Sequence, residues 1–105
     1  MPKSILIAED DMIISMVLER KVRKMNHNVA KTVTTGDEAI KAVEKLAPEL
    51  ILMDVQLGDE IDGIEAMNRI RKTSKVPVIY ISGNTDIRNL KRAKQTRYIE
   101  YMVKP

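Results

Sequence analysis

Acidic side chains stand directly after two short apolar runs of this sequence. Asp54 ends the run at residues 50–53, and the pair Glu9 and Asp10 follows the run at residues 4–8. Apolar runs of this length are too short for an ordinary helix and favour strands that are buried on both faces. An ionised carboxylate at the end of a buried strand is costly unless a cation or a metal ion lies beside it. A single such acid could merely begin a turn, but two independent acidic strand ends predict a site.

A hydroxyl and an ammonium group follow the last two apolar runs. Ser82 ends residues 76–82, and Lys104 comes directly after residues 98–103. A site whose ligands are all oxygen atoms selects a hard cation. With few protein ligands and room for water and phosphate, such a site suits Mg²⁺ better than Ca²⁺. Mg²⁺ and one lysine would offset three carboxylates and admit an anionic phosphoryl group. Because carboxylates form aspartyl phosphates when they are positioned and neutralised, the pattern indicates phosphoryl transfer to Asp54.

The elements that must position these residues alternate along the chain. We expect strands at residues 4–8, 29–33, 50–54, 76–82 and 98–103. Helices are expected between them, the first starting at about residue 11 and the last covering residues 85–96. Asp11 is placed to cap the first helix, and Thr35 with Glu38 three residues later predicts a capping box for the second.

Apolar residues at helical spacing indicate which helix faces point inward. The first helix is expected to bury Ile13, Ile14, Val17, Leu18, Val22 and Met25, and the third Ile64, Met67 and Ile70. The fourth has only Ile87, Leu90 and Ala93. So thin a stripe suits a short surface helix, and it equally suits a segment of low local stability that rearranges at modest cost.

Five strands that alternate with helices predict one parallel sheet with helices on both faces, since parallel neighbours need right-handed crossover connections. The fold class is therefore α/β, with a doubly wound five-stranded parallel sheet. In such folds ligands bind outside the carboxyl ends of the strands, and all the polar residues described above lie there. The first strand is not followed by Gly-x-Gly-x-x-Gly, and the chain has no Walker-type Gly-Lys-Ser/Thr, so nucleotide binding is disfavoured.

Composition excludes several other kinds of site. With 105 residues and 44% hydrophobic content, the chain is expected to form a single domain over residues 1–105. It has no cysteine, which excludes disulfides and thiolate zinc sites, and one histidine, His27, which excludes a multi-histidine metal site. It has no apolar run of about 18 residues and no signal peptide, so we expect a soluble cytoplasmic protein without membrane contact.

A net charge of +3 and a pI near 9.2 permit a nucleic-acid-binding hypothesis. Basic residues cluster at positions 20–24, 69–72 and 88–97. However, the chain has no Phe or Trp to stack on bases, and neither a helix-turn-helix pair nor an RNA-binding aromatic motif is present. We therefore interpret the basic clusters as solvated surface and expect no direct nucleic-acid binding.

The ordered set of motifs resembles the receiver domains of two-component response regulators, of which the small chemotaxis regulator is the best-known single-domain member. The match spans essentially all 105 residues. The acidic pair of that family corresponds to Glu9 and Asp10 in Ile-Leu-Ile-Ala-Glu-Asp-Asp, and its phosphoacceptor to Asp54 in Leu-Ile-Leu-Met-Asp. Asp62-Gly63 corresponds to the Asp-Gly that opens the third helix of the family.

The resemblance implies a role for each site residue. Asp10, Asp54 and the backbone carbonyl of Gln56 would bind Mg²⁺ directly, and Glu9 mainly through water. Lys104, within Val-Lys-Pro, would pair with the phosphoryl group. The hydroxyl of the family falls on Ser82 and its switch aromatic on Tyr101, although Tyr101 could also be an ordinary strand aromatic.

The resemblance also implies how such a chain works. A sensor histidine kinase, a phosphotransfer protein or a small acyl phosphate would phosphorylate Asp54. Ser82 would then move toward a phosphoryl oxygen, Tyr101 would rotate into the vacated space, and the face formed by the fourth helix and fifth strand would change shape. This change would alter the binding of a downstream protein or effector domain. The chain would catalyse only its own phosphorylation and dephosphorylation.

Two other functions compete with this one. Haloacid dehalogenase-like phosphatases also phosphorylate an Asp at the end of a parallel strand, but their general acid two residues later is replaced here by Gln56. A phosphorylation-independent interaction module could retain the fold alone. The complete set of site residues argues against such a degenerate module.

The resemblance implies a flavodoxin-like strand order of 2-1-3-4-5, with three departures from the family. The loop at residues 58–61 is about one residue longer than its commonest form, Gly83 stands where a small Ala is usual, and the final helix is missing from the chain. We therefore expect exposed apolar side chains among residues 50–53, 78–81 and 99–103. A continuation of the chain beyond Pro105, a second copy in a homodimer, or another protein would cover them.

Overall fold

The computed structural model describes residues 1–58, 60–83 and 86–104. Its elements are β1 (Ser4–Ala8), α1 (Met12–Lys24), β2 (Asn28–Val33), α2 (Gly36–Leu46), β3 (Leu50–Asp54), α3 (Gly63–Ile70), β4 (Val78–Ser82), α4 (Ile87–Lys94) and β5 (Glu100–Val103). The expected alternation is confirmed, with shorter fourth and fifth strands. Thr85, the expected first residue of the fourth helix, lies outside the described residues, as do Asp59 of the long loop and Pro105.

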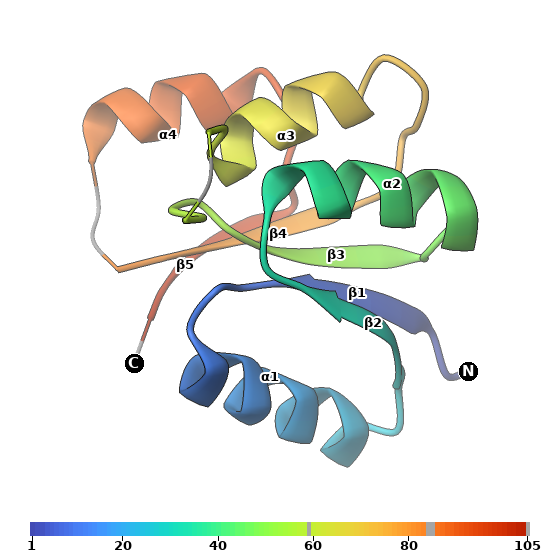
Figure 1. Cartoon of the computed structure of the whole chain (residues 1–105). Coiled ribbons are helices and arrows are strands. Elements are labelled where there is room, and N and C mark those ends of the chain that lie inside the picture. Colours follow the sequence, from blue (N-terminus) through green and yellow to red (C-terminus); the bar gives the residue numbers. More distant parts are fainter. Residues whose placement is uncertain (59, 84–85, 105) are drawn as a thin grey trace.

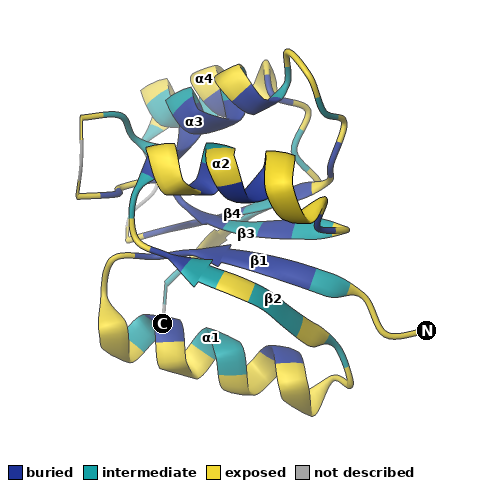
Figure 2. Ribbon diagram, turned by 45° about the vertical axis from the view of Figure 1, so that its right-hand side comes forward, coloured by how far each residue is buried: buried dark blue, intermediate teal, exposed yellow. Residues whose placement is uncertain are grey.

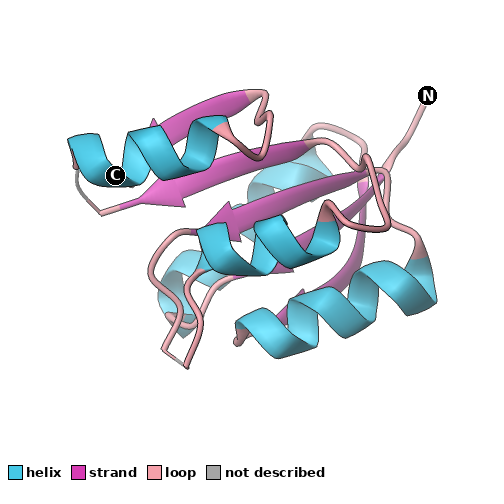
Figure 3. Cartoon of the chain, turned by 90° about the horizontal axis from the view of Figure 1, so that it is seen from above, coloured by secondary structure: helices cyan, strands magenta, loops and turns pink. Residues whose placement is uncertain are grey.

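The five strands form one parallel sheet in the order β2-β1-β3-β4-β5, which confirms the predicted strand order. Because all strands run the same way, their carboxyl ends share one edge of the sheet. Among the described elements, α2, α3 and α4 lie side by side over one face, and α1 is the one helix on the other face, beneath β1 and β2 (Figures 1 and 3). No helix of the described part of the chain is long and apolar enough to cross a membrane.

The main hydrophobic core lies between the sheet and the three helices above it (Figure 2). The predicted inner face of α3 is confirmed, because Ile64, Met67 and Ile70 are all buried in this core. Met53 of β3 and Tyr80 of β4 are fully buried beneath them. This packing fixes the ends of β3 and β4, from which Asp54 and Ser82 project.

Helix α1 contacts the sheet through a narrow stripe. Ser15 and Val22 are buried and Leu18 is half-buried, which is a spacing of three and four residues. The prediction that Ile13, Val17 and Met25 point inward is wrong, since their exposures are 75%, 40% and 61%. Helix α1 has no neighbouring helix among the described elements to cover its two sides. It therefore buries a narrower apolar face than its sequence periodicity predicts.

Ile87 departs from the prediction in the same way, because it is 69% exposed while Ala93 is fully buried and Leu90 half-buried. Helix α4 therefore has an even thinner apolar contact than expected. The predicted exposure of apolar residues is confirmed for Ile99, Met102 and Val103, which are all more than half exposed. It is wrong for residues 50–53 and 78–81, which are all buried or half-buried.

Both predicted helix caps are confirmed. Asp11 accepts hydrogen bonds from the backbone N–H groups of Ile13 and Ile14, at 2.9 and 3.2 Å. Thr35 accepts from the N–H of Glu38 at 3.1 Å, and the Glu38 carboxylate accepts in return from Thr34 and Thr35. The Asp11 cap begins α1 immediately after the acidic pair and so holds that pair at the edge of the sheet.

Gly63 and Gly83 allow a test of the packing at this edge. A Cβ on Gly63 would lie 2.1 Å from the backbone oxygen of Asp54, whereas a Cβ on Gly83 would meet no atom of the described residues within 4 Å. We expect Gly63→Ala to lower the free energy of unfolding by about 3 kcal/mol or more, because backbone must move to relieve the overlap. Gly83→Ala, the matched control, should change it by less than about 1 kcal/mol. Urea denaturation of both variants measures the difference, and equal midpoints would contradict the described contact between α3 and β3.

Candidate functional site

The acids that follow β1 and β3 meet at the carboxyl edge of the sheet, as the sequence predicts. Glu9, Asp10 and Asp54 each offer one carboxylate oxygen, and these oxygens lie within 4.8 Å of one another. Glu9 and Asp54 are each only 1% exposed, while Asp10 is exposed. Clustered oxygen donors with one open side are the ligand set of a hard divalent cation such as Mg²⁺, so the residues present fit that ion.

Lys104 lies between the two buried acids. Its Nζ is 2.9 Å from Glu9 Oε1 and 3.0 Å from Asp54 Oδ2, and its side chain is 16% exposed. The backbone N–H of Lys104 donates to the carbonyl of Ser82 at 2.7 Å, which attaches the end of the chain after β5 to the end of β4. One cation therefore contacts acids from two other strands.

Backbone hydrogen bonds orient both buried carboxylates. The N–H of Gln56 donates to Asp54 Oδ1 at 3.0 Å, and the N–H of Asp10 donates to Glu9 Oε2 at 3.0 Å. Asp54 Oδ2 is thereby directed toward Lys104. Gln56 itself is exposed in the turn that follows β3.

The negative charges of the two carboxylates exceed the positive charge of the one ammonium group. Burial and the adjacent Glu9 carboxyl together raise the pKa of Asp54 to about 7, even though Lys104 and the Gln56 N–H act to lower it. Burial also acts to raise the pKa of Glu9, but hydrogen bonds with Asp54 and Lys104 lower it overall. The pKa of Lys104 is raised because its two carboxylate partners outweigh the effect of burial. The site thus favours an additional positive charge, either a proton or a metal ion.

Ser82 and Tyr101 lie where the sequence places them, at the end of β4 and within β5. Ser82 is fully buried. The ring of Tyr101 is 5.9 Å from those of both Tyr80 and Tyr98, and its hydroxyl is buried with no hydrogen-bond partner among the described residues. The cluster of three tyrosines was not predicted, because it depends on the pairing of Tyr80 with Tyr101 across β4 and β5.

Sequence reasoning also missed an ion pair that joins the site loop to α4. Arg92 contacts Asp62 through two hydrogen bonds of 2.8 and 3.0 Å, and Asp62 accepts a third from the N–H of Glu65 at 2.8 Å. Burial would raise the pKa of Asp62, but Arg92 and the Glu65 N–H lower it overall. Asp62 therefore caps α3 and holds α4 with the same carboxylate. No local pattern predicts this ion pair, since the partners are 30 residues apart.

Gly58 is a second residue that the sequence did not single out. A Cβ at this position would lie 2.9 Å from Asp10 Oδ2, so the backbone of the loop after β3 passes directly beside the exposed acid. The absence of a side chain at Gly58 leaves room for the Asp10 carboxylate within the acidic cluster.

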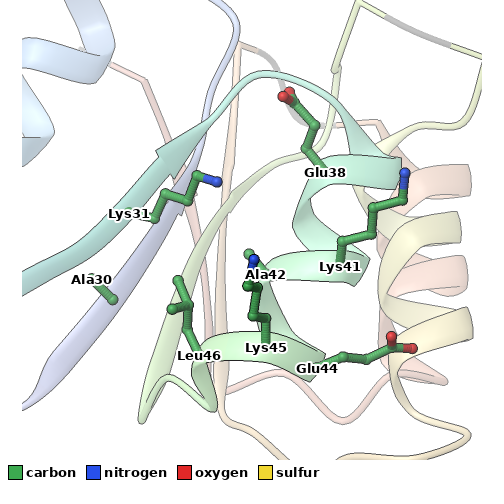
Figure 4. A pocket seen from close by; sticks show the side chains of 8 residues that line it. All are labelled: Ala30, Lys31, Glu38, Lys41, Ala42, Glu44, Lys45 and Leu46. Atoms are coloured by element: carbon green, nitrogen blue, oxygen red, sulfur yellow. The ribbon is translucent and has the colours of Figure 1, made fainter.

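A cleft of about 880 Å³ lies between β2 and α2, away from the acidic cluster (Figure 4). It is lined by Ala30, Lys31, Glu38, Lys41, Ala42, Glu44, Lys45 and Leu46. None of the acids at the carboxyl edge of the sheet lines it, so size alone does not identify the site where phosphoryl chemistry is expected.

Comparison with known proteins agrees with this geometry. The family model of the response regulator receiver domain matches residues 5–105. The phyllosphere-induced regulator PhyR of Methylorubrum extorquens is 46% identical over 83 residues, which are 78% of this chain and 31% of that protein. The transcriptional regulatory protein AfsQ1 of Streptomyces coelicolor is 34% identical over 102 residues, 97% of this chain and 44% of that protein.

Solved structures show the same fold. The signal receiver domain of a modulated diguanylate cyclase from Desulfovibrio desulfuricans matches with a TM-score of 0.93 at 27% identity, covering 100% of this chain and 83% of that one. The chain spans less than half the length of PhyR and AfsQ1. Since the family model covers nearly the whole chain and the strand order and acidic strand ends agree with it, the chain belongs to the response regulator receiver domain family of two-component signalling.

Proposed function

We propose that residues 1–105 form a receiver domain that works as a phosphorylation-dependent switch, with Asp54 as the phosphoacceptor. The observation that supports this most strongly is the buried pair Glu9 and Asp54, which share Lys104 as their one cationic partner among the described residues. Glu9, Asp10, Asp54 and the carbonyl of Gln56 would hold Mg²⁺. When bound, Mg²⁺ would neutralise charge on the phosphoryl oxygens during transfer.

The proposed reaction uses the orientation of the Asp54 carboxylate. Its Oδ1 is fixed by the N–H of Gln56, so Oδ2 is the oxygen directed at Lys104 and available to attack phosphorus. The donor is the phosphohistidine of a sensor kinase or phosphotransfer protein, or a small acyl phosphate. With phosphohistidine, the new O–P bond forms as the N–P bond breaks, and the electron pair of that bond returns to the imidazole. Lys104 would then pair with a phosphoryl oxygen.

The proposed switch extends from the site to α4 and β5. Ser82 would donate its hydroxyl hydrogen bond to a phosphoryl oxygen, and Tyr101 would move into the space that Ser82 leaves. The Tyr101 hydroxyl is buried without a partner among the described residues, and an unsatisfied buried hydroxyl costs about 1–3 kcal/mol. A second position that satisfies it would recover part of this cost, and a difference of this size is enough to shift a two-state equilibrium. The altered α4 and β5 face would bind a downstream protein or effector domain.

The identity of the acceptor can be tested by mass. Incubation with acetyl phosphate and Mg²⁺ should add one phosphoryl group to the protein, because Asp54 Oδ2 is held beside Lys104 and the neighbouring acids. The Asp54→Asn variant should remain unmodified in the same intact-mass measurement, and Asp37→Asn, which removes an exposed acid on α2, should be labelled like the parent. Full labelling of Asp54→Asn would show that another residue is the acceptor.

The metal site can be tested by stability. Mg²⁺ at ten times its dissociation constant should raise the free energy of unfolding by about 1.4 kcal/mol, because it relieves repulsion between carboxylates only in the folded state. The melting temperature should rise by several degrees, and EDTA should reverse the change. Asp10→Ala should abolish the response, whereas Asp37→Ala should retain it. A parent melting temperature that does not depend on Mg²⁺ would contradict the proposed site.

The Asp62–Arg92 pair predicts a dependence on pH. Because the folded state lowers the pKa of Asp62, the pair stabilises the protein above the ordinary carboxyl pKa of about 4, and this stability is lost as pH falls through the folded pKa. Asp62→Asn, which keeps the helix cap, should lower the free energy of unfolding at pH 7 by about 1 kcal/mol, after allowance for partial exposure of both side chains. Urea titrations from pH 7 to pH 3 should show this deficit shrinking. A deficit that stays constant with pH would mean that the charge of Asp62 is not its cause.

A further inference from the structure

The positive charge of this protein is concentrated around α4. Residues 86–97 contain five basic residues and one acidic residue, a net charge of +4, whereas the whole chain has +3. Arg92 is paired with Asp62, and Arg88 with Asp86. Lys91, Lys94 and Arg97 form no ion pair with the described residues. Some of these basic side chains are simply exposed to solvent, but Arg97 lines a cleft with other basic residues.

Arg97 shares a cleft with two cationic residues that follow α3. Arg71, Lys75, Pro77, Arg97 and Ile99 line an open cleft of about 360 Å³. It lies where β4 and β5 begin, at the opposite end of the sheet from Asp54. Across the ranges that the structure describes, none of the three cations has a carboxylate partner. Three like charges thus converge without compensation.

Arg71 is held in place by hydrogen bonds to backbone. Its Nε donates to the carbonyl of Thr96 at 2.7 Å, and its Nη1 donates to that of Ser74 at 3.4 Å. A guanidinium has five N–H donors, so several remain for another acceptor. Burial, with a smaller effect of the Arg97 charge, lowers the pKa of Arg71. The folded protein therefore holds a fixed, partly desolvated guanidinium beside a second one.

Arg97 is held in an unfavourable backbone conformation. Its φ angle is 56°, in the left-handed region that glycine adopts without strain and other residues rarely adopt. Its N–H donates to the carbonyl of Lys94 at 3.1 Å, as at many helix ends where glycine is usual. A cationic side chain at a glycine-like position, next to another guanidinium, is doubly unfavourable for stability. This combination points to a ligand that interacts with the Arg97 side chain.

The cleft between β2 and α2 provides a contrast. It also contains three lysines, but Glu38 and Glu44 line it with them, so most of its charge is compensated within the protein (Figure 4). The cleft at Arg97 is lined by three basic residues and no acid. The uncompensated cleft is the one whose charge would attract an anion.

We propose that the cleft formed by Arg71, Lys75 and Arg97 binds a doubly charged oxyanion of the phosphate class. Arg71 supplies a fixed fork of donors, and the exposed side chains of Lys75 and Arg97 close on the anion from either side. This site is separate from Asp54, and its existence does not depend on phosphoryl transfer there.

Titration with inorganic phosphate, in the absence of Mg²⁺, tests the proposal. Phosphate should shift the ¹⁵N–¹H signals of residues 71–76 and 96–99 and raise the melting temperature, whereas chloride at equal ionic strength should do neither. Succinate serves as a dicarboxylate of similar charge and should bind more weakly. Equal effects of chloride and phosphate would mean that salt merely screens the repulsion between the basic residues, and would contradict a phosphate site. Stronger binding of succinate than of phosphate would overturn the phosphate assignment.

Substitution of Arg97 separates binding from folding. Arg97→Gly should raise the melting temperature without phosphate, because glycine relieves the strained φ angle, and should weaken phosphate binding at least about tenfold through loss of one charge. Lys91→Ala is the matched control, since it removes an exposed, unpaired cation of α4 that does not line the cleft. It should bind phosphate like the parent. If Arg97→Gly binds phosphate as tightly as Lys91→Ala does, the cleft is not the site.

Discussion

The contact between Lys104 and two buried carboxylates is the interaction on which the arrangement of the site depends. Glu9, Asp54 and Lys104 come from the ends of β1, β3 and β5, so one ammonium group connects strands distributed across the sheet. Removing one partner of a buried ion pair typically costs about 3–5 kcal/mol, because the remaining charge is left without compensation. Lys104 is therefore a structural residue as well as a proposed catalytic one, and the unmodified site has a defined resting geometry.

That resting geometry remains electrostatically incomplete. Two acids share one cation, and the exposed acid Asp10 lies within reach of both. The same crowding that raises the pKa of Asp54 also favours a divalent cation, which reconciles a buried acid with the need for an ionised nucleophile. A hydrolytic function has less support, because the position two residues after Asp54 is occupied by Gln56, whose amide cannot act as a general acid.

Helix α4 is attached to the rest of the fold mainly by polar contacts. Arg92 links it to Asp62 at the start of α3, and Gly63, the next residue, packs directly against the backbone of Asp54. Two residues beyond the C-terminal end of α4, the Thr96 hydroxyl contacts that of Tyr80 at 2.7 Å, and Tyr80 packs against Tyr101. With only Ala93 fully buried in the helix, these few contacts fix its position. A small rearrangement at either attachment would therefore be sufficient to shift the helix.

Local signals predicted much of this structure, and long-range ones did not. Asp11 and Thr35 were identified as caps because capping depends on residues two or three positions away. The convergence of the acids could be predicted because the carboxyl ends of parallel strands share one edge of the sheet. The inward face of α1 was misjudged, because periodicity does not reveal how many neighbours a helix has. The pairs Asp62–Arg92 and Tyr80–Tyr101 depend on packing and register between distant segments, for which a single sequence contains no signal.

The two ends of the sheet have opposite charge, and distance keeps them electrostatically independent. Acids gather where the strands end, and Arg71, Lys75 and Arg97 gather where β4 and β5 begin. A strand of five residues separates the two sites by about 16 Å, whereas exposed charges are screened over about 8 Å at physiological ionic strength. An anion at the cationic cleft would therefore influence Asp54 little through the electric field. The Thr96 contacts with Arg71 and Tyr80 join the cleft to the end of α4 and to the tyrosine cluster, and so offer a route for coupling through packing.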